Sequence, residues 1–373
     1  MTLSDRDHAD GPASTWMGRP FLFAVAALNA VTGIGFGIAI GPANFGLDSG
    51  LFRHCALLLS QGARDFCPGF PYPPLAQIAA LPLTVLPPTA AMLVMSLIGL
   101  VILVLGVGLE TRGQARIDRV LVLVAALTFV PAVYELLLGQ TTLLIAAAVY
   151  VVVRRPDSTR NGIPLGFALA LAPKPMLLPL IVWMVVWRRR SVMSALITAG
   201  ALTGLGVALL GFAQYRDWFA VLTGAARQVS DGSFWLSSAD MGNHSLWPLT
   251  PLTSVVAALV VGATLWAIRK DVSRGFVASL FAGLLLAPYS LPYAYTILLL
   301  AVKPGLVFAP RATRALALSA NLAAGYLIKA LTVWTIAGVA ACLTLPPSRR
   351  LRLGVSRRGN GSGILGTAET GEE

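Results

Sequence analysis

Long apolar runs, separated by short charged breaks, recur along this chain between residues 21 and 345. A helix needs about 20 mostly apolar residues to cross the hydrocarbon core of a bilayer, and several of these runs reach that length. Hydrophobic residues make up 56% of the 373 residues and charged residues only 12%, about half the charged share of a typical soluble domain. We therefore predict an all-α polytopic membrane protein rather than a soluble one.

The basic residues predict how the chain is oriented. The net charge of +12 could indicate nucleic-acid binding, but the arginines stand in short breaks between apolar runs and in the C-terminal tail. This placement follows the positive-inside rule, so we expect membrane lipids as partners and no nucleic acid. With the basic breaks and both termini in the cytoplasm, the segments 41–72, 135–140 and 211–250 lie outside.

We expect three parts: a cytoplasmic tail (1–19), a transmembrane domain (20–345) and a disordered basic cytoplasmic tail (346–373). Counting the apolar runs, with both termini on the same side of the membrane, gives about ten transmembrane helices. Aromatic residues mixed with charges in the two long outside loops favour short interfacial helices. Prolines interrupt the apolar segments and indicate broken or re-entrant helices beside a cavity, because freed backbone groups need partners at membrane depth. The interrupted segments are 74–86, 166–187 and 278–301.

Asp48 lies in the first outside loop, ahead of an amphipathic stretch. A carboxylate there can accept a proton from an attacking hydroxyl. It can equally cap the helix that it opens, because Asp is a favoured N-cap residue. The same loop contains His54 and Tyr72, which are candidates for substrate binding. Tyr72 belongs to a proline-rich segment that is alternatively a rigid turn and nothing more.

Lys174 stands between two prolines in the middle of an apolar stretch. A cation is costly in hydrocarbon, so it normally faces a cavity or an anion, and either a phosphate or Glu135 could be that anion. Glu135 and Gln140 form a polar corner between two apolar helices, and Asn243 with His244 forms another near the end of the second long outside loop. Each corner could bind a hydroxyl-rich sugar or be only a turn.

No cofactor or metal is predicted. The histidines and acids lack the helical spacing of a metal pair, and the chain has no Gly-rich phosphate loop or nucleotide-binding domain. Energy must therefore come with the substrate or from a gradient. The three cysteines lack the spacing of a metal site, but Cys55 and Cys67 flank one loop and could pair if that loop faces an oxidising compartment.

Over residues 20–345 the chain resembles polytopic glycosyltransferase family 87, the mannosyltransferase-like members of the glycosyltransferase C superfamily that use polyprenyl-phosphate sugars. The motifs that carry the resemblance, in the order of the family, are Asp48 after the first helix, Tyr72-Pro73-Pro74-Leu75, Gly139-Gln140 with Leu143-Leu144, Lys174-Pro175 with Leu177-Leu178, and Gly242-Asn243-His244-Ser245-Leu246. The chain departs from the family at Thr142, where Asn is frequent, and at His244, where Gln is frequent. The segment 288–293 also lacks the family's Trp and His. These departures leave the sugar and the acceptor open.

The resemblance implies inverting transfer of a hexose such as mannose from a polyprenyl-phosphate donor to a lipid or glycan acceptor, at the outer face of the cell membrane. Asp48 would be the general base and Lys174 would neutralise the departing phosphate. The other candidate substrate-binding residues are Tyr72, Gln140, Asn243 and His244, which lie in motifs of the resemblance, and Glu135 and His54, which lie outside them. Two alternatives remain: a transporter or flippase of lipid-linked precursors, and a non-catalytic subunit of an envelope-assembly complex.

Overall fold

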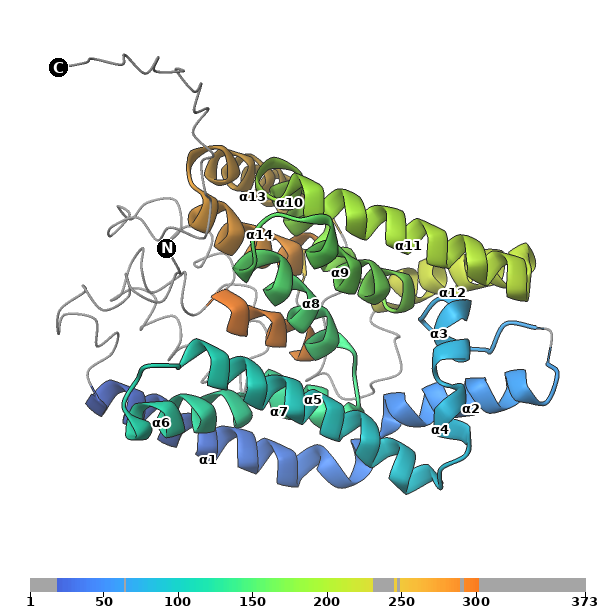
Figure 1. Cartoon of the computed structure of the whole chain (residues 1–373), viewed down its shortest axis with the longest axis horizontal. Coiled ribbons are helices and arrows are strands. Elements are labelled where there is room, and N and C mark those ends of the chain that lie inside the picture. The colour runs from blue at the N-terminus through green and yellow to red at the C-terminus, as the bar shows by residue number, and fades with distance from the viewer. Residues whose placement is uncertain (1–18, 64, 231–244, 247–248, 289–291, 302–373) are drawn as a thin grey trace, which may run out of the picture.

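The computed structural model describes residues 19–63, 65–230, 245–246, 249–288 and 292–301. Within these ranges the regular structure is entirely helical. One group of helices packs along one side of the molecule (Figure 1): α1 (Arg19–Asn44), α5 (Pro88–Glu110), α6 (Arg116–Leu127) and α7 (Val130–Leu138). A second group lies along the other side: α9 (Thr159–Leu171), α10 (Leu178–Trp187), α11 (Arg189–Leu210), α13 (Pro251–Lys270) and α14 (Val272–Leu286).

Shorter elements join the two groups. The helix α8 (Thr142–Arg154) packs against α5 and α9, and the 3₁₀ segment η4 (Pro292–Ala301) packs against α7, α8 and α14. At one end of the molecule, α2 (Leu47–Ser60) contacts the first group, α4 (Leu81–Thr84) packs on α2, and α3 (Pro74–Ala79) reaches α9 and α11. The chain entering and leaving this end therefore touches both groups.

Three helices, α5, α11 and α13, are long and apolar enough to cross a membrane. The helices α6 and α7 pass the same test as a pair, bent by 60° at their break, so the described residues contain up to four such spans. Along α5, the large apolar residues Leu93, Leu97 and Leu105 are exposed, which suits contact with lipid rather than water. An all-α membrane protein is thus confirmed, whereas the predicted count of about ten crossings is not established by these ranges.

The predicted breaks occur at their prolines. The segment 74–86 is divided into α3 and α4, and α14 ends at Leu286 before η4 begins at Pro292. The helix α9 ends at Leu171, and the chain then runs without helix to the 3₁₀ turn η2 (Pro175–Leu177), which leads into α10. Lys174 lies in this break, because the two prolines beside it cannot donate the hydrogen bonds of a continuous helix.

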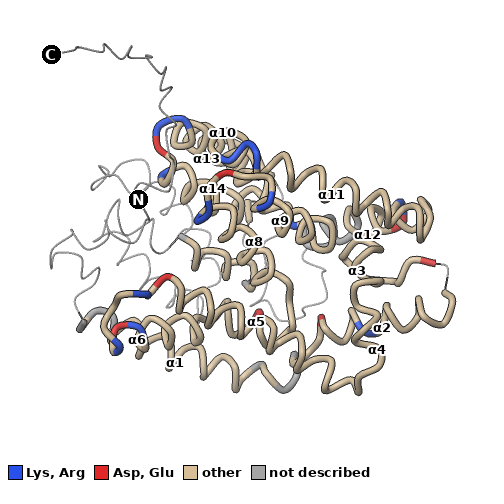
Figure 2. The backbone as a smooth tube through the Cα atoms, in the orientation of Figure 1, with Lys and Arg blue, Asp and Glu red and all other residues tan. Residues whose placement is uncertain are grey.

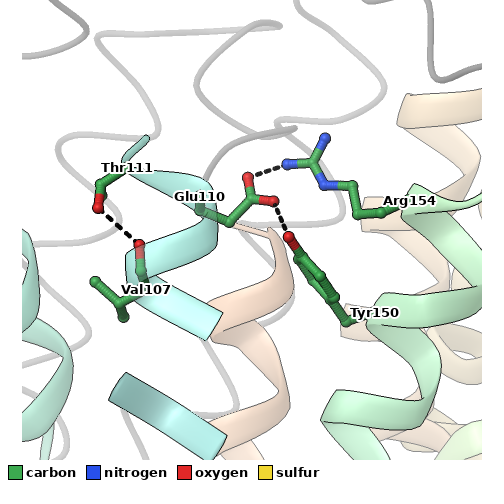
Figure 3. Close-up of polar contacts among 5 residues, drawn as sticks. All are labelled: Val107, Glu110, Thr111, Tyr150 and Arg154. Atoms are coloured by element: carbon green, nitrogen blue, oxygen red, sulfur yellow. Dashed lines mark hydrogen bonds and ion pairs between the residues drawn. The ribbon is translucent and has the colours of Figure 1, made fainter. Parts of the chain in front are cut away.

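Charged residues are unevenly distributed over the molecule. Figure 2 shows the arginines of α6 and of the α8–α9, α10–α11 and α13–α14 connections on one side of the view, with α2, α3 and α12 (Phe212–Ser230) at the other end. Polar contacts tie α5 of the first group to the connecting helix α8 at the basic end (Figure 3). Glu110 of α5 accepts a hydrogen bond from the Tyr150 hydroxyl at 2.7 Å and pairs with Arg154, both from α8.

The two predicted outside loops contain helices, as expected. α2 follows α1 directly, and α12 follows α11. Trp218 of α12 donates a hydrogen bond from Nε1 to the carbonyl oxygen of Pro71 at 3.2 Å, and Tyr215 of the same helix is buried. The helix α12 therefore covers the segment that leads into Tyr72.

Cys55 and Cys67 form a disulfide that closes the first loop, with their Cα atoms 5.5 Å apart. Both cysteines are buried beside Phe52, Phe70 and Tyr72, whose rings pack against one another. The sequence had left this pairing open. Disulfides form and persist mainly in oxidising compartments, which agrees with an outside position for the loop.

Removing this disulfide is expected to destabilise the protein. Closing a loop of this length restricts the unfolded chain by about 3 kcal/mol, so the double variant Cys55→Ala, Cys67→Ala should unfold at a clearly lower temperature in detergent. The variant Cys342→Ala, which keeps the disulfide, is the control. Equal unfolding temperatures of the double variant and the wild-type protein would contradict the expectation.

Candidate active site

The first turn of α2 presents Asp48 toward the interior. The helix is preceded by Gly46 in a left-handed conformation (φ 71°), and no side chain caps it. The Gly46 N–H donates to the carbonyl oxygen of Leu137 at 2.7 Å, which fixes the start of α2 against the end of α7. Asp48 is 5% exposed. The alternative in which Asp48 serves as the N-cap is therefore wrong.

The end of α7 brings Gln140 to Asp48. Gly139 terminates the helix in the left-handed conformation (φ 70°), and Gln140 then donates a hydrogen bond from Nε2 to Asp48 Oδ2. A Cβ atom at Gly139 would lie 2.8 Å from the Cβ atom of Ser49, the neighbour of Asp48. Only glycine fits both the backbone conformation and this approach of α7 to α2.

We expect Gly139→Ala to separate these two elements. The positive φ costs about 1–2 kcal/mol for alanine. The added Cβ atom would also press against Ser49 and so move Gln140 away from Asp48. A matched control is Gly113→Ala, because Gly113 also has a positive φ (86°) but has no atom within 4 Å of its added Cβ. Both variants should lose thermal stability, and only Gly139→Ala should lose transfer activity. Equal activities of the two variants would rule out this role for Gly139.

Tyr72 and Lys174 contact the oxygen of the Gln140 side-chain amide, whose nitrogen donates to Asp48. The Tyr72 hydroxyl donates to Gln140 Oε1 at 2.6 Å, and Lys174 Nζ lies 3.5 Å from that oxygen in a long hydrogen bond. Tyr72 comes from the loop after Cys67, and Lys174 comes from the break between α9 and η2. Four predicted site residues that are distant in sequence, Asp48, Tyr72, Gln140 and Lys174, are thus brought into one cluster.

Lys174 is partly buried and has an aromatic neighbour. Its Nζ atom lies 4.7 Å from the centre of the Tyr293 ring, a distance suited to a cation–π contact. The Tyr293 ring is in turn 6.1 Å from the ring of Tyr134 on α7. In the described part of the chain, Glu135 forms no direct ion pair with Lys174. Its Oε1 atom accepts the N–H of Leu143 at 2.9 Å, while its Oε2 atom is buried and has no hydrogen-bond partner among the described residues.

Burial changes the acidity of Asp48. It raises the pKa of this carboxyl to about 6, against the opposing effects of the Gln140 hydrogen bond and the positive charge of Lys174. The helix α2 is not one of the candidate membrane spans. A carboxylate with this pKa is ionised at neutral pH and is a stronger proton acceptor than an exposed aspartate.

The remaining predicted residues lie elsewhere or outside the description. His54 is exposed, on a different face of α2 from Asp48. Asn243 and His244 fall outside the described residues, but their motif ends beside α14, where the Leu246 N–H donates to the carbonyl oxygen of Leu285 at 2.9 Å. Within the described residues, no group of three or more His, Cys, Asp or Glu side chains could hold a metal ion.

Sequence reasoning missed Tyr293 and Tyr134. Tyr293 directly follows Pro292 in a segment whose break was recognised, and Tyr134 directly precedes Glu135. Their positions next to polar or broken stretches were visible, but a tyrosine in an apolar run gives no signal of its own. Only the placement of Lys174 over the Tyr293 ring identifies them as part of the cluster.

Comparison with known proteins gives one finding. No curated protein and no solved structure matches the chain. Residues 70–292, more than half of the 373-residue sequence, match glycosyltransferase family 87. The matched range includes Tyr72, Gln140 and Lys174, while Asp48 precedes it. On the extent of this match, the chain belongs to glycosyltransferase family 87.

Proposed function

We propose that this glycosyltransferase moves a hexose, in the simplest case mannose, from a polyprenyl-phosphate donor to a lipid or glycan acceptor of the cell envelope, with inversion at the anomeric carbon. The observation that carries the proposal is the buried Asp48 carboxylate, which Gln140 links to the Lys174 ammonium. A base and a cation in one cluster are the two groups that this displacement needs.

Asp48 would act through its free carboxylate oxygen. Its Oδ2 atom accepts the Gln140 amide, and within the described residues Oδ1 has no hydrogen bond. An acceptor hydroxyl at Oδ1 would give up its proton to Asp48 while its oxygen forms a bond to the anomeric carbon. The bond from that carbon to the phosphate oxygen breaks, and the polyprenyl phosphate leaves with the electron pair. A single displacement of this kind inverts the configuration.

Lys174 would stabilise the phosphate as it departs. Its ammonium group is held over Tyr293 and near Gln140, and its side chain comes from a helix break rather than from a lipid-facing helix surface. Negative charge that develops on the leaving oxygen is stabilised most strongly by a cation fixed in place before the reaction. Asp48 and Lys174 would therefore act on opposite sides of the same sugar carbon.

Lipid-linked substrates and an outer active site fit the surroundings of the cluster. A shallow apolar groove of about 510 Å³ lies at the α6–α7 bend, lined by Gly37 and Ile38 of α1 and by Val133 and Leu137 of α7. The Leu137 carbonyl oxygen also accepts the N–H of Gly46 at the start of α2, so this groove and the α2 turn that carries Asp48 share one residue of α7. The Cys55–Cys67 disulfide and the basic connections at the other end support a site outside and termini in the cytoplasm.

The direct test is transfer of radiolabelled mannose from synthetic polyprenyl-phosphate mannose to a membrane lipid extract by the purified protein in lipid nanodiscs. We expect a labelled product whose anomeric configuration, read by NMR, is opposite to that of the donor. Retention of configuration would exclude the single displacement. No transfer from any of a panel of polyprenyl-phosphate hexoses, together with movement of intact lipid-linked sugar across proteoliposomes, would contradict the proposal and favour a flippase.

A further inference from the structure

The Gln140 side chain has only one orientation that satisfies its neighbours. Its Oε1 atom accepts from the Tyr72 hydroxyl and from Lys174 Nζ, and its Nε2 atom donates to Asp48. The reversed amide would set its oxygen against a carboxylate oxygen and its NH₂ group against an ammonium, which has no acceptor. The two donors on one side therefore fix the amide, and the amide fixes the carboxylate.

Every part of this contact is held by a different element. Gln140 follows the left-handed Gly139 at the end of α7, and its side chain is 7% exposed. Tyr72 is packed between the rings of Phe52, at 4.4 Å, and Phe70, at 5.4 Å. Both lone pairs of Oε1 and one N–H of Nε2 are therefore engaged with protein groups, which leaves the amide a single N–H for any other partner.

We propose that Gln140 is a positioning residue: its amide holds Oδ2 of Asp48 so that Oδ1 is presented to the acceptor, and it couples the base to Lys174. This inference rests on the proposed function for the role of Asp48. It gives Gln140 a role different from the expected one of binding substrate. Because Lys174 and Asp48 share one amide, a phosphate that draws Lys174 away would change the hydrogen bond that the base receives.

Among the described residues, few charged or titratable groups surround Asp48. Tyr72 and Lys174 meet the amide, Tyr134 of α7 interacts electrostatically with Asp48, and Glu135 acts on Lys174. The helices α3 and α4 carry no charged residue, and the single acid of α5, Glu110, stands at its far end. On α2 itself, Arg53 is directed to the carbonyl oxygen of Leu86 and His54 is exposed.

The inference is tested by titrating Asp48 itself, without any substrate. The infrared carboxyl band that disappears in Asp48→Asn reports its protonation in purified protein. In Gln140→Met the side chain keeps its length but loses the amide donor, so the pKa of Asp48 should rise by about one pH unit. In Gln140→Glu a second carboxylate replaces the amide donor and should raise the pKa of Asp48 further. The control is Gln77→Met, since Gln77 is also buried but its Nε2 atom has no partner among the described groups.

Transfer from polyprenyl-phosphate mannose supplies the second readout. A positioning role predicts that Gln140→Met lowers kcat, moves the acidic limb of the pH profile upward and leaves KM for the donor nearly unchanged. A substrate-binding role predicts the reverse, with KM raised and the pH limb unmoved. An unshifted Asp48 titration in both Gln140 variants overturns the inference even if transfer is observed. If the Asp48 titration shifts in both Gln140 variants but the wild-type protein transfers no sugar, the Gln140–Asp48 contact is retained and the proposed reaction is contradicted.

Discussion

Replacing Asp48 with asparagine is expected to lower the rate of sugar transfer by about 10²–10⁴-fold, the usual contribution of a positioned general base. The amide has nearly the shape of the carboxylate, and its oxygen can still accept the hydrogen bond from Gln140 Nε2. It cannot take the acceptor's proton at neutral pH. The measurement is transfer from polyprenyl-phosphate mannose by purified wild-type and variant proteins at the same lipid composition.

The pH dependence and the stability of the two proteins make this test sharper. Because the pKa of Asp48 is raised to about 6, the wild-type rate should be constant at neutral pH and fall as the pH falls through about 6. The raised pKa also means that ionised Asp48 disfavours folding above pH 6, so Asp48→Asn should unfold at an equal or higher temperature at pH 7.5. The control is Asp217→Asn, because the side chain of Asp217 on α12 is half-exposed. A folded Asp48→Asn protein with more than about a tenth of the wild-type rate would remove Asp48 as the base.

Much of the fold could be predicted because its causes are local. Apolar runs long enough to span a bilayer are visible in composition alone, and Pro173 and Pro175 mark a break wherever they stand, since proline lacks the backbone donor. The number of crossings could not be predicted as firmly. The pair α6 and α7 shows why, because a 60° bend at Thr128–Phe129 makes one apolar run into two short helices.

The sequence predicted four members of the cluster, but it predicted neither the tyrosines Tyr134 and Tyr293 nor the contacts among the members. Asp48 was selected by its place in the first outside loop, Gln140 by the polar corner between two apolar helices, and Lys174 by its place in the middle of an apolar stretch. Sequence spacing could not show that a left-handed Gly139 directs Gln140 to Asp48, or that the start of α2 is held by Leu137 rather than by the Asp48 side chain. These features depend on the packing of α7 against α2, which is a long-range contact. For the same reason, the sequence alone could not show that Lys174 lies over the Tyr293 ring.

Replacing Lys174 with methionine is expected to lower kcat for transfer from a polyprenyl-phosphate donor by about 10²–10³-fold, the effect of removing one preorganised group that stabilises transition-state charge. Methionine keeps the length and apolar stem of the side chain, and losing a partly buried cation should not destabilise the fold. Lys174→Arg, which keeps the charge on a differently shaped group, should retain more activity than Lys174→Met. The control is Lys270→Met, since Lys270 is exposed at the end of α13.

The division of the Lys174→Met effect between kcat and KM decides what Lys174 does. The donor carries negative charge before it reacts, so a cation that only binds the phosphate stabilises the ground state and the transition state alike, and its loss raises KM alone. A cation that responds to charge developing on the leaving oxygen lowers kcat when it is removed. Combining Lys174→Met with Asp48→Asn adds a second criterion. If the base and the cation act in one displacement, the fold-decrease in transfer rate of the double variant should be much smaller than the product of the two single fold-decreases. A fold-decrease equal to that product would mean that Asp48 and Lys174 serve separate steps.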